Sequence, residues 1–297
     1  MKSGFVAIIG RPNAGKSTLL NTILGEKIAI TTPKAQTTRN AILGIYNRED
    51  LQIVFIDTPG IHKAETNLGS YMNKEALSQA AGVDVIYYIA DGSRGLRDED
   101  QEILEKLFSY EIPVFYLVNK IDMMSRDELI ERLAYAGKNY DFAEIIPISA
   151  LSNDNIDDLL ETTEKYLHDD IRYFPEDAVS SMSRDFRISE IIREKVIMNT
   201  EQEVPHLAAC QVEEVKETEK KMYIEATIIC NKPGHKGIII GRGGSMLKKI
   251  NDAASKDLKE LFGKKIILSL YVRVEEDWLN KDKRLFELGY FRGDQDE

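Results

Sequence analysis

The sequence predicts an α/β domain with a mostly parallel sheet and helices on both faces, followed by a smaller α+β domain. Up to about residue 168, continuously apolar runs alternate with helix-like segments, which is typical of such a sheet. Beyond it the order is a helix, two strands, a glycine-rich loop with a helix, and a last strand. A chain of 297 residues is long enough for two domains. We expect the first domain to span residues 1–168, a linker 169–184, and the second domain 185–297.

The strands of the first domain are predicted from runs that stay apolar on both faces, as buried parallel strands do. These runs are FVAIIG (5–10), IVFIDT (53–58), VIYYIA (85–90), VFYLVN (114–119) and IIPIS (145–149). An antiparallel edge pair is expected within 41–57, on either side of the turn signal Arg48-Glu49-Asp50.

The second domain begins after a change of composition. Residues 168–186 contain Pro175, three serines and five acidic residues, which indicates a linker. A helix is expected next, with Ile188, Ile191, Ile192 and Val196 on one face. The remaining elements are predicted as strands at 207–217 and 221–230, a helix at about 244–261, and a strand at 266–274.

Composition narrows the class of protein. The formal net charge of −11 argues against nucleic-acid binding over the whole surface, although it leaves local basic patches open. Cys210 and Cys230 have no Cys-x-x-Cys spacing and fit a reduced cytoplasm. No run approaches the roughly 20 apolar residues that span a bilayer. The expected location is therefore cytoplasmic.

The segment GRPNAGKST at 10–18 carries the first functional signal. It satisfies G-x-x-x-x-G-K-[ST] between a strand and a helix, so it predicts a phosphate-binding loop. Lys16 should bridge the β- and γ-phosphates, and the Ser17 hydroxyl should bind Mg²⁺. The predicted nucleotide contacts of this loop are Gly10, Arg11, Pro12, Asn13, Ala14, Gly15, Lys16, Ser17 and Thr18.

A second motif, DTPG at 57–60, closes the strand IVFID. Asp57 is expected near Mg²⁺, and the Gly60 N–H is expected to contact the γ-phosphate. Thr58 and Pro59 are the remaining predicted nucleotide-binding residues of this motif. Alone the motif is also a plausible turn, and its position after a phosphate loop favours the functional interpretation.

A third motif, NKID at 119–122, selects the base. The Asp122 carboxylate accepts two hydrogen bonds from guanine N1–H and N2–H₂, whereas adenine offers neither donor. Asn119 and Lys120 should brace the loop and cover the base. Ser149 and Ala150 end the next strand, where a backbone N–H reaches guanine O6.

The three motifs in this order resemble the translation-factor-like P-loop GTPases over about residues 4–168. The resemblance implies GTP, Mg²⁺ and hydrolysis to GDP, with Lys16, Thr38, Asp57 and Gly60 as the catalytic set. It also implies that a threonine between the first two motifs binds Mg²⁺. Thr37 and Thr38 are both candidates, and Thr38, directly before Arg39, is favoured. GTP is expected to order residues 31–39 and 57–70.

Ile61 follows DTPG, where Ras-like proteins have the glutamine that orients the attacking water. Isoleucine cannot hydrogen-bond this water, so the intrinsic rate is expected to be slow. In GTPases with an asparagine at the place of Asn13 and an apolar residue after DTPG, K⁺ can sit near the phosphates. Asn13 is therefore a candidate K⁺ ligand, and its alternative role is to shape the loop.

The segment KGIIIGRGGSMLKKI at 236–250 contains Gly-x-x-Gly before a basic helix. Residues 231–265 hold nine Lys or Arg against three acidic residues, a local net charge of +6. This matches the loop of KH domains, which clamps about four single-stranded nucleotides. The predicted RNA-binding residues are Lys236, Ile239, Gly241, Arg242, Gly243, Gly244, Lys248 and Lys249. The order of elements is similar to that of the prokaryotic, type II KH fold.

A GTPase domain followed by a single KH domain is the layout of the Era family. Further segments carry this resemblance: KAQTTR, DTPGIHK, the linker RYFPED, IIREKV and the closing ELGY. It implies a monomer that binds near the 3′ end of 16S rRNA, acts in 30S assembly, and associates peripherally with the membrane. One alternative is a membrane-associated signalling GTPase whose KH-like domain binds protein. A P-loop kinase is a further alternative, against which NKID argues.

Overall fold

The computed structural model describes residues 1–34, 37–61, 64 and 66–290. Parts of the two segments expected to respond to GTP, residues 35–36, 62–63 and 65, lie outside this description. The chain forms two compact units. The first comprises residues 1–31, 38–64 and 72–181, and the second comprises residues 32–37, 65–71 and 182–297. The exact bounds of the predicted domains and linker stay a prediction.

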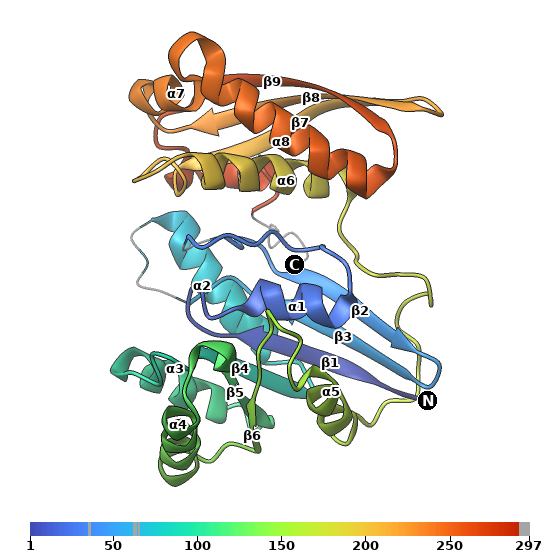
Figure 1. The fold of residues 1–297 in the computed structure, drawn as a ribbon, viewed down its shortest axis with the longest axis vertical. Coiled ribbons are helices and arrows are strands. Elements are labelled where there is room, and N and C mark those ends of the chain that lie inside the picture. Colours follow the sequence, from blue (N-terminus) through green and yellow to red (C-terminus); the bar gives the residue numbers. More distant parts are fainter. Residues whose placement is uncertain (35–36, 62–63, 65, 291–297) are drawn as a thin grey trace. The chain divides into compact units, whose positions relative to one another are not determined.

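The first unit contains a six-stranded sheet in the order β2-β3-β1-β4-β5-β6 (Figure 1). Its strands are β1 (Lys2–Ile9), β2 (Ile42–Arg48), β3 (Leu51–Asp57), β4 (Val85–Asp91), β5 (Val114–Asn119) and β6 (Glu144–Pro147). All neighbours pair in parallel except β2 and β3, which form the expected antiparallel edge. The mostly parallel sheet is therefore confirmed.

Helices cover both faces of this sheet. They are α1 (Lys16–Leu24), α2 (Asn67–Ala80), α3 (Asp98–Phe108), α4 (Arg126–Asn139) and α5 (Ile156–Glu164), with a short 3₁₀ turn η1 (Ile121–Met123). Side chains alternate along β4, so consecutive tyrosines face opposite helices. Tyr88 packs in a core with Leu104 of α3 and Ala136 of α4, whereas the Tyr87 hydroxyl contacts Thr163 on α5.

The three nucleotide motifs follow strands that end at one edge of the sheet. Ile8 of β1 pairs with Asp57 of β3, and Asp91 of β4 pairs with Asn119 of β5. Because parallel strands bring their carboxyl ends together, the loops after them converge on one crevice, where open α/β sheets bind ligands.

The second unit is a three-stranded sheet, in the order β7-β8-β9, with helices packed on one face. Its elements are α6 (Arg184–Asn199), β7 (Ala208–Glu217), β8 (Lys221–Cys230), α7 (Pro233–Ile240), η2 (Arg242–Gly244), α8 (Ser245–Phe262), β9 (Lys265–Val274), η3 (Trp278–Asn280) and α9 (Asp282–Glu287). The pair β7–β8 is antiparallel and the pair β8–β9 is parallel. The parallel pair requires a crossover, which α7 and α8 provide. The α+β prediction is confirmed.

Two features of this unit were not predicted. Residues 233–240 form helix α7, although the sequence analysis placed no helix there. Residues after β9 continue as η3 and α9, and Trp278 is fully buried with its Nε1–H donating to the Leu207 carbonyl 3.2 Å away. The stretch up to residue 290 is therefore part of the folded unit. Within the described part of the chain, no helix is both long and apolar enough to cross a bilayer.

Candidate nucleotide site and nucleic-acid interface

The phosphate loop is tight because two of its glycines lie against neighbouring strands. A Cβ on Gly10 would come 2.2 Å from the Ile89 carbonyl oxygen. Gly15 has φ of +107°, and a Cβ there would come 2.2 Å from Asn119 Nδ2. Side chains at these positions would force the loop apart, so glycine is required at both.

Lys16 is buried at the start of α1, with its side chain curled into this loop. Its ammonium donates to the carbonyl oxygens of Gly10, at 3.1 Å, and Arg11, at 3.0 Å. Burial lowers the pKa of Lys16 to about 8, and the charge of Asp57 opposes this shift. An anionic polyphosphate in the loop would supply the charged partner that these carbonyls do not, and would raise this pKa.

Three predicted Mg²⁺ ligands converge beside the loop. Ser17 Oγ lies 2.8 Å from Thr38 Oγ1 and donates to Asp57 Oδ2 at 2.7 Å. Burial raises the pKa of Asp57 to about 6, and Lys16, Ser17 and Thr38 each oppose the rise. The Asp57 Oδ1 atom is buried and has no hydrogen-bond partner. A carboxylate and two hydroxyls with one unsatisfied oxygen fit a hard divalent cation such as Mg²⁺.

The geometry also bears on the choice between the two threonines. The Thr37 hydroxyl lies 2.6 Å from Thr32 Oγ1 and donates to the Lys34 carbonyl at 2.8 Å. Only Thr38 lies with Ser17 and Asp57, so the structure supports Thr38 as the Mg²⁺ candidate.

The DTPG segment is fixed against the phosphate loop. Thr58 Oγ1 donates to the Ile8 carbonyl at 2.8 Å, and the Ile61 N–H donates to the Gly10 carbonyl at 3.3 Å. A Cβ on Gly60 would come 2.9 Å from the backbone of Pro12. Gly60 therefore lies at the loop where a γ-phosphate would be sensed.

The base-recognition residues are held by a network around Asn119. Asn119 Nδ2 donates to the Ala14 carbonyl at 2.8 Å, and Asn119 Oδ1 accepts the Ala150 N–H at 3.0 Å. Ser149 Oγ donates to Asp122 Oδ1 at 2.5 Å. One asparagine thus joins the phosphate loop to the loop after β6, as a site for a single nucleotide requires.

Two supporting side chains of this network were missed by sequence reasoning. Asp91, at the end of β4, forms an ion pair with Lys120 at 2.7 Å, and it fixes a lysine whose backbone has φ of +68°. Thr22 of α1 donates to the Ala150 carbonyl at 2.7 Å. Neither belongs to a motif, because each acts through a contact with residues distant in sequence.

The glycine-rich loop of the second unit joins α7 to α8. Gly241, Gly243 and Gly244 all have positive φ, and a Cβ on Gly241 would come 2.7 Å from that of Met246. Helix α8 has no side-chain N-cap and no acidic residue in its first turn. Its first N–H groups and dipole therefore favour an anion at this end. Arg242, Lys248 and Lys249 are exposed around the loop, and Lys236 is half-buried.

The prediction that Ile239 contacts RNA is wrong. Its side chain is fully buried in the core of the second unit, because it lies on the face of α7 that packs against the sheet. Ile238, one residue earlier, is 47% exposed and is the residue that offers apolar surface.

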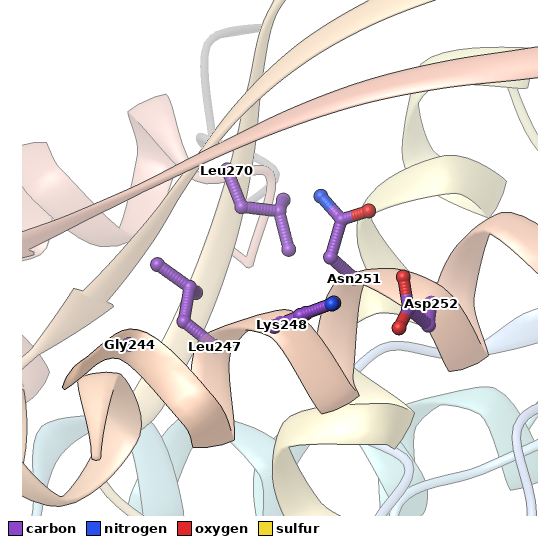
Figure 2. A pocket seen from close by; sticks show the side chains of 6 residues that line it. All are labelled: Gly244, Leu247, Lys248, Asn251, Asp252 and Leu270. Carbon is purple, nitrogen blue, oxygen red and sulfur yellow. The ribbon is translucent and has the colours of Figure 1, made fainter. Parts of the chain in front are cut away.

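A pocket of about 310 Å³ lies beside this loop, between α8 and β9 (Figure 2). Leu247 and Asn251 reach from α8 toward Leu270 of β9, with Lys248 and Asp252 along the same helix. Asn251 Nδ2 donates to the Leu268 carbonyl at 2.8 Å, which fixes the amide at the pocket wall. Apolar walls with amide and carboxylate groups suit an unstacked base. No sequence motif marks this pocket, because its lining residues come from both a helix and a strand.

Comparison with known proteins identifies both domains. The model of the family described as "50S ribosome-binding GTPase" matches residues 5–120, and that of the KH domain matches residues 203–279. GTPase Era from two strains of Clostridium kluyveri is 46% identical over 291 residues, which cover 98% of this chain and 99% of the relative. The chain belongs to the Era family of GTPases.

Solved Era structures have the same fold. A variant of Aquifex aeolicus Era bound to GDP and AlF₄⁻ has a TM-score of 0.95 at 37% identity, and it covers 98% of this chain and 99% of its own. Era in complex with MgGDPNP and nucleotides 1506–1542 of 16S ribosomal RNA gives the same values. The predicted P-loop GTPase domain followed by a KH domain is confirmed, and the chain is a GTPase.

Proposed function

We propose that this GTPase is a GTP-controlled RNA-binding protein that binds the 3′-end region of 16S rRNA through its KH domain and acts in 30S assembly. The observation that carries the proposal is the pairing of a complete nucleotide site with a glycine-rich basic loop and its adjacent pocket. Supporting it, a relative with 37% identity was solved in complex with MgGDPNP and nucleotides 1506–1542 of 16S ribosomal RNA.

In the nucleotide site, Lys16 would neutralise charge on the β- and γ-phosphates, and the loop N–H groups would bind the remaining oxygens. Mg²⁺ would be held by Ser17, Thr38 and Asp57 and would supply further charge neutralisation. The Gly60 N–H would bind the γ-phosphate, and Asp122 would select guanine. Hydrolysis then depends on positioning and charge stabilisation more than on a base.

We propose that K⁺ supplies additional positive charge near the phosphates. This charge would compensate for Ile61, which cannot orient the attacking water. The Asn13 backbone has φ of +63°, a left-handed conformation that asparagine tolerates, which also fits its alternative role of shaping the loop. Hydrolysis in KCl should exceed that in NaCl at equal ionic strength by roughly tenfold or more, because a fixed positive charge stabilises the charge that develops in the transition state. Single-turnover rates measure this, and Asn13→Ala should remove the difference. Equal rates in the two salts would rule out the K⁺ role.

In the KH domain, main-chain atoms of Gly241, Gly243 and Gly244 would approach the RNA backbone, and Arg242, Lys248 and Lys249 would neutralise its phosphates. Such contacts alone are indifferent to sequence. The base preference is assigned to the pocket lined by Leu247, Asn251, Asp252 and Leu270. Lys236, beside the loop, adds to the local positive charge.

The test of this function is a titration with single-stranded RNA that copies the 3′ end of 16S rRNA, with a scrambled RNA of equal length as the control. Tighter binding of the copy supports the proposal. If the protein binds neither RNA, the alternative function is favoured. In that alternative the chain is a membrane-associated signalling GTPase whose KH-like domain binds protein.

A cytoplasmic monomer with a peripheral inner-membrane association remains a prediction from the family resemblance. Sedimentation analysis tests the monomer, and flotation with vesicles of inner-membrane lipid composition tests the association.

A further inference from the structure

The side chain of Arg11, in the phosphate loop, reaches carboxylates of α3. Its Nη1 lies 2.8 Å from Glu99 Oε2 and 3.8 Å from Asp100 Oδ2. Its place in the motif predicts that Arg11 contacts the nucleotide. Its guanidinium instead pairs with carboxylates 88 and 89 residues away in sequence.

Asp100 is a fixed anchor for this contact. Its side chain is only 2% exposed. It accepts the Tyr88 hydroxyl at 2.5 Å from β4 and the Arg97 N–H at 2.8 Å at the start of its own helix. A carboxylate held by a strand and by a helix cap has little freedom to move. Because the Asp100 end of the ion pair is buried and the Arg11 side chain is 33% exposed, solvent screens this pair less than one between two exposed side chains.

The main chain of Arg11 takes part in the phosphate loop. Its carbonyl oxygen accepts Lys16 Nζ at 3.0 Å and the Ala14 N–H at 3.4 Å. The residue whose carbonyl orients Lys16, Arg11, therefore also has its side chain ion-paired with α3. Tyr88, which holds Asp100, is paired in the sheet with Ile9, two residues before Arg11. The Arg11–Asp100 contact therefore links the phosphate loop, which follows β1, to α3, and Tyr88 links α3 to β4, the neighbour of β1 in the sheet.

We propose that Arg11 is a positioning residue, whose ion pair with Asp100 holds the phosphate loop so that its carbonyl orients Lys16 for phosphate. The inference rests on the proposed nucleotide site and adds α3 to it. Glu99 makes the shorter contact with Arg11, but its side chain is 68% exposed, so solvent screens that ion pair more than the pair with the buried Asp100.

The experiment compares nucleotide affinity and melting temperature for wild type, Arg11→Ala, Asp100→Asn and the double variant. Asp100→Asn keeps an acceptor for the Arg97 N–H and removes the charge that binds Arg11. Glu102→Gln is the matched control, because it makes the same change in charge at an exposed position on the same helix. Affinities for fluorescent GDP and a fluorescent non-hydrolysable GTP analogue are measured by titration well below the melting temperature.

Each single variant should lose about tenfold in affinity for both nucleotides. The double variant should be no weaker than the weaker single variant, because both changes remove one interaction. Glu102→Gln should bind as wild type. A loss with Arg11→Ala but none with Asp100→Asn would overturn the proposal, since Arg11 would then contact phosphate directly. The proposal would also be overturned if the affinity losses of the two single variants multiplied in the double variant. Unchanged affinities, with or without a change in melting temperature, would overturn it as well. Failure of the wild type to bind GTP would instead contradict the proposed nucleotide site.

Discussion

Replacing Lys16 by alanine is expected to abolish measurable GTP binding. The ammonium is buried in the phosphate loop, where water would replace its proposed contacts with two phosphates poorly. Hydrogen bonds to charged groups are worth about 1.5–3 kcal/mol each, so two such contacts predict a loss of at least about a hundredfold in affinity. Titration with a fluorescent non-hydrolysable GTP analogue measures the effect.

Lys138→Ala is the matched control, since this lysine is exposed on α4 in the same unit. It should leave the affinity unchanged. The melting temperature of Lys16→Ala should be compared with that of wild type without nucleotide, to separate a lost contact from a lost fold. Tight GTP binding by a folded Lys16→Ala variant would contradict the assignment of the loop.

The combined change Arg242→Asp and Gly243→Asp is expected to remove RNA binding and leave basal GTP hydrolysis intact. It places two negative charges where the RNA backbone is proposed to lie. Gly243 is chosen because a Cβ there meets no atom within 4 Å, whereas one on Gly241 would strike Met246. Aspartate also tolerates the φ of +59° better than most residues. RNA affinity should fall by about a hundredfold. The slope of log affinity against log salt concentration should decrease by about one, as expected when one phosphate contact is lost.

Lys220→Asp is the control for two of the three units by which the tested variant lowers the net charge, because Lys220 is exposed at the β7–β8 turn. A loss of similar size in this variant would mean that overall charge, and no particular loop, attracts RNA. Retained RNA affinity in the Arg242→Asp, Gly243→Asp variant would mean that the glycine-rich loop is structural. Hydrolysis by both variants is followed by phosphate release.

The sequence was most informative where chemistry depends on residues that are adjacent in the chain. The phosphate loop, DTPG and NKID each follow a strand, and buried parallel strands are recognisable as apolar runs. Their convergence follows from parallel pairing alone. By contrast, α7 was missed because Pro233-Gly-His-Lys-Gly has no helical periodicity before its three isoleucines.

Contacts between residues that are distant in the chain could not be predicted from the sequence. Which of three consecutive isoleucines faces the core depends on how α7 packs, so Ile239 was assigned to RNA although it is buried. The ion pair of Arg11 with Asp100 and the bond from Thr22 to Ala150 join residues far apart in the chain. The pocket likewise needs Leu270 of β9 to lie over α8. Such pairings become visible only when the fold has brought the elements together.

The central claim is that one chain joins a GTP switch to recognition of a particular RNA. The most direct test is the affinity for RNA that copies the 3′ end of 16S rRNA, measured against the scrambled RNA with protein loaded with GDP or a non-hydrolysable GTP analogue. The account predicts that the copy binds more tightly than the scrambled RNA and that this preference differs between the two nucleotide states. Equal affinity for both RNAs in both states would contradict it.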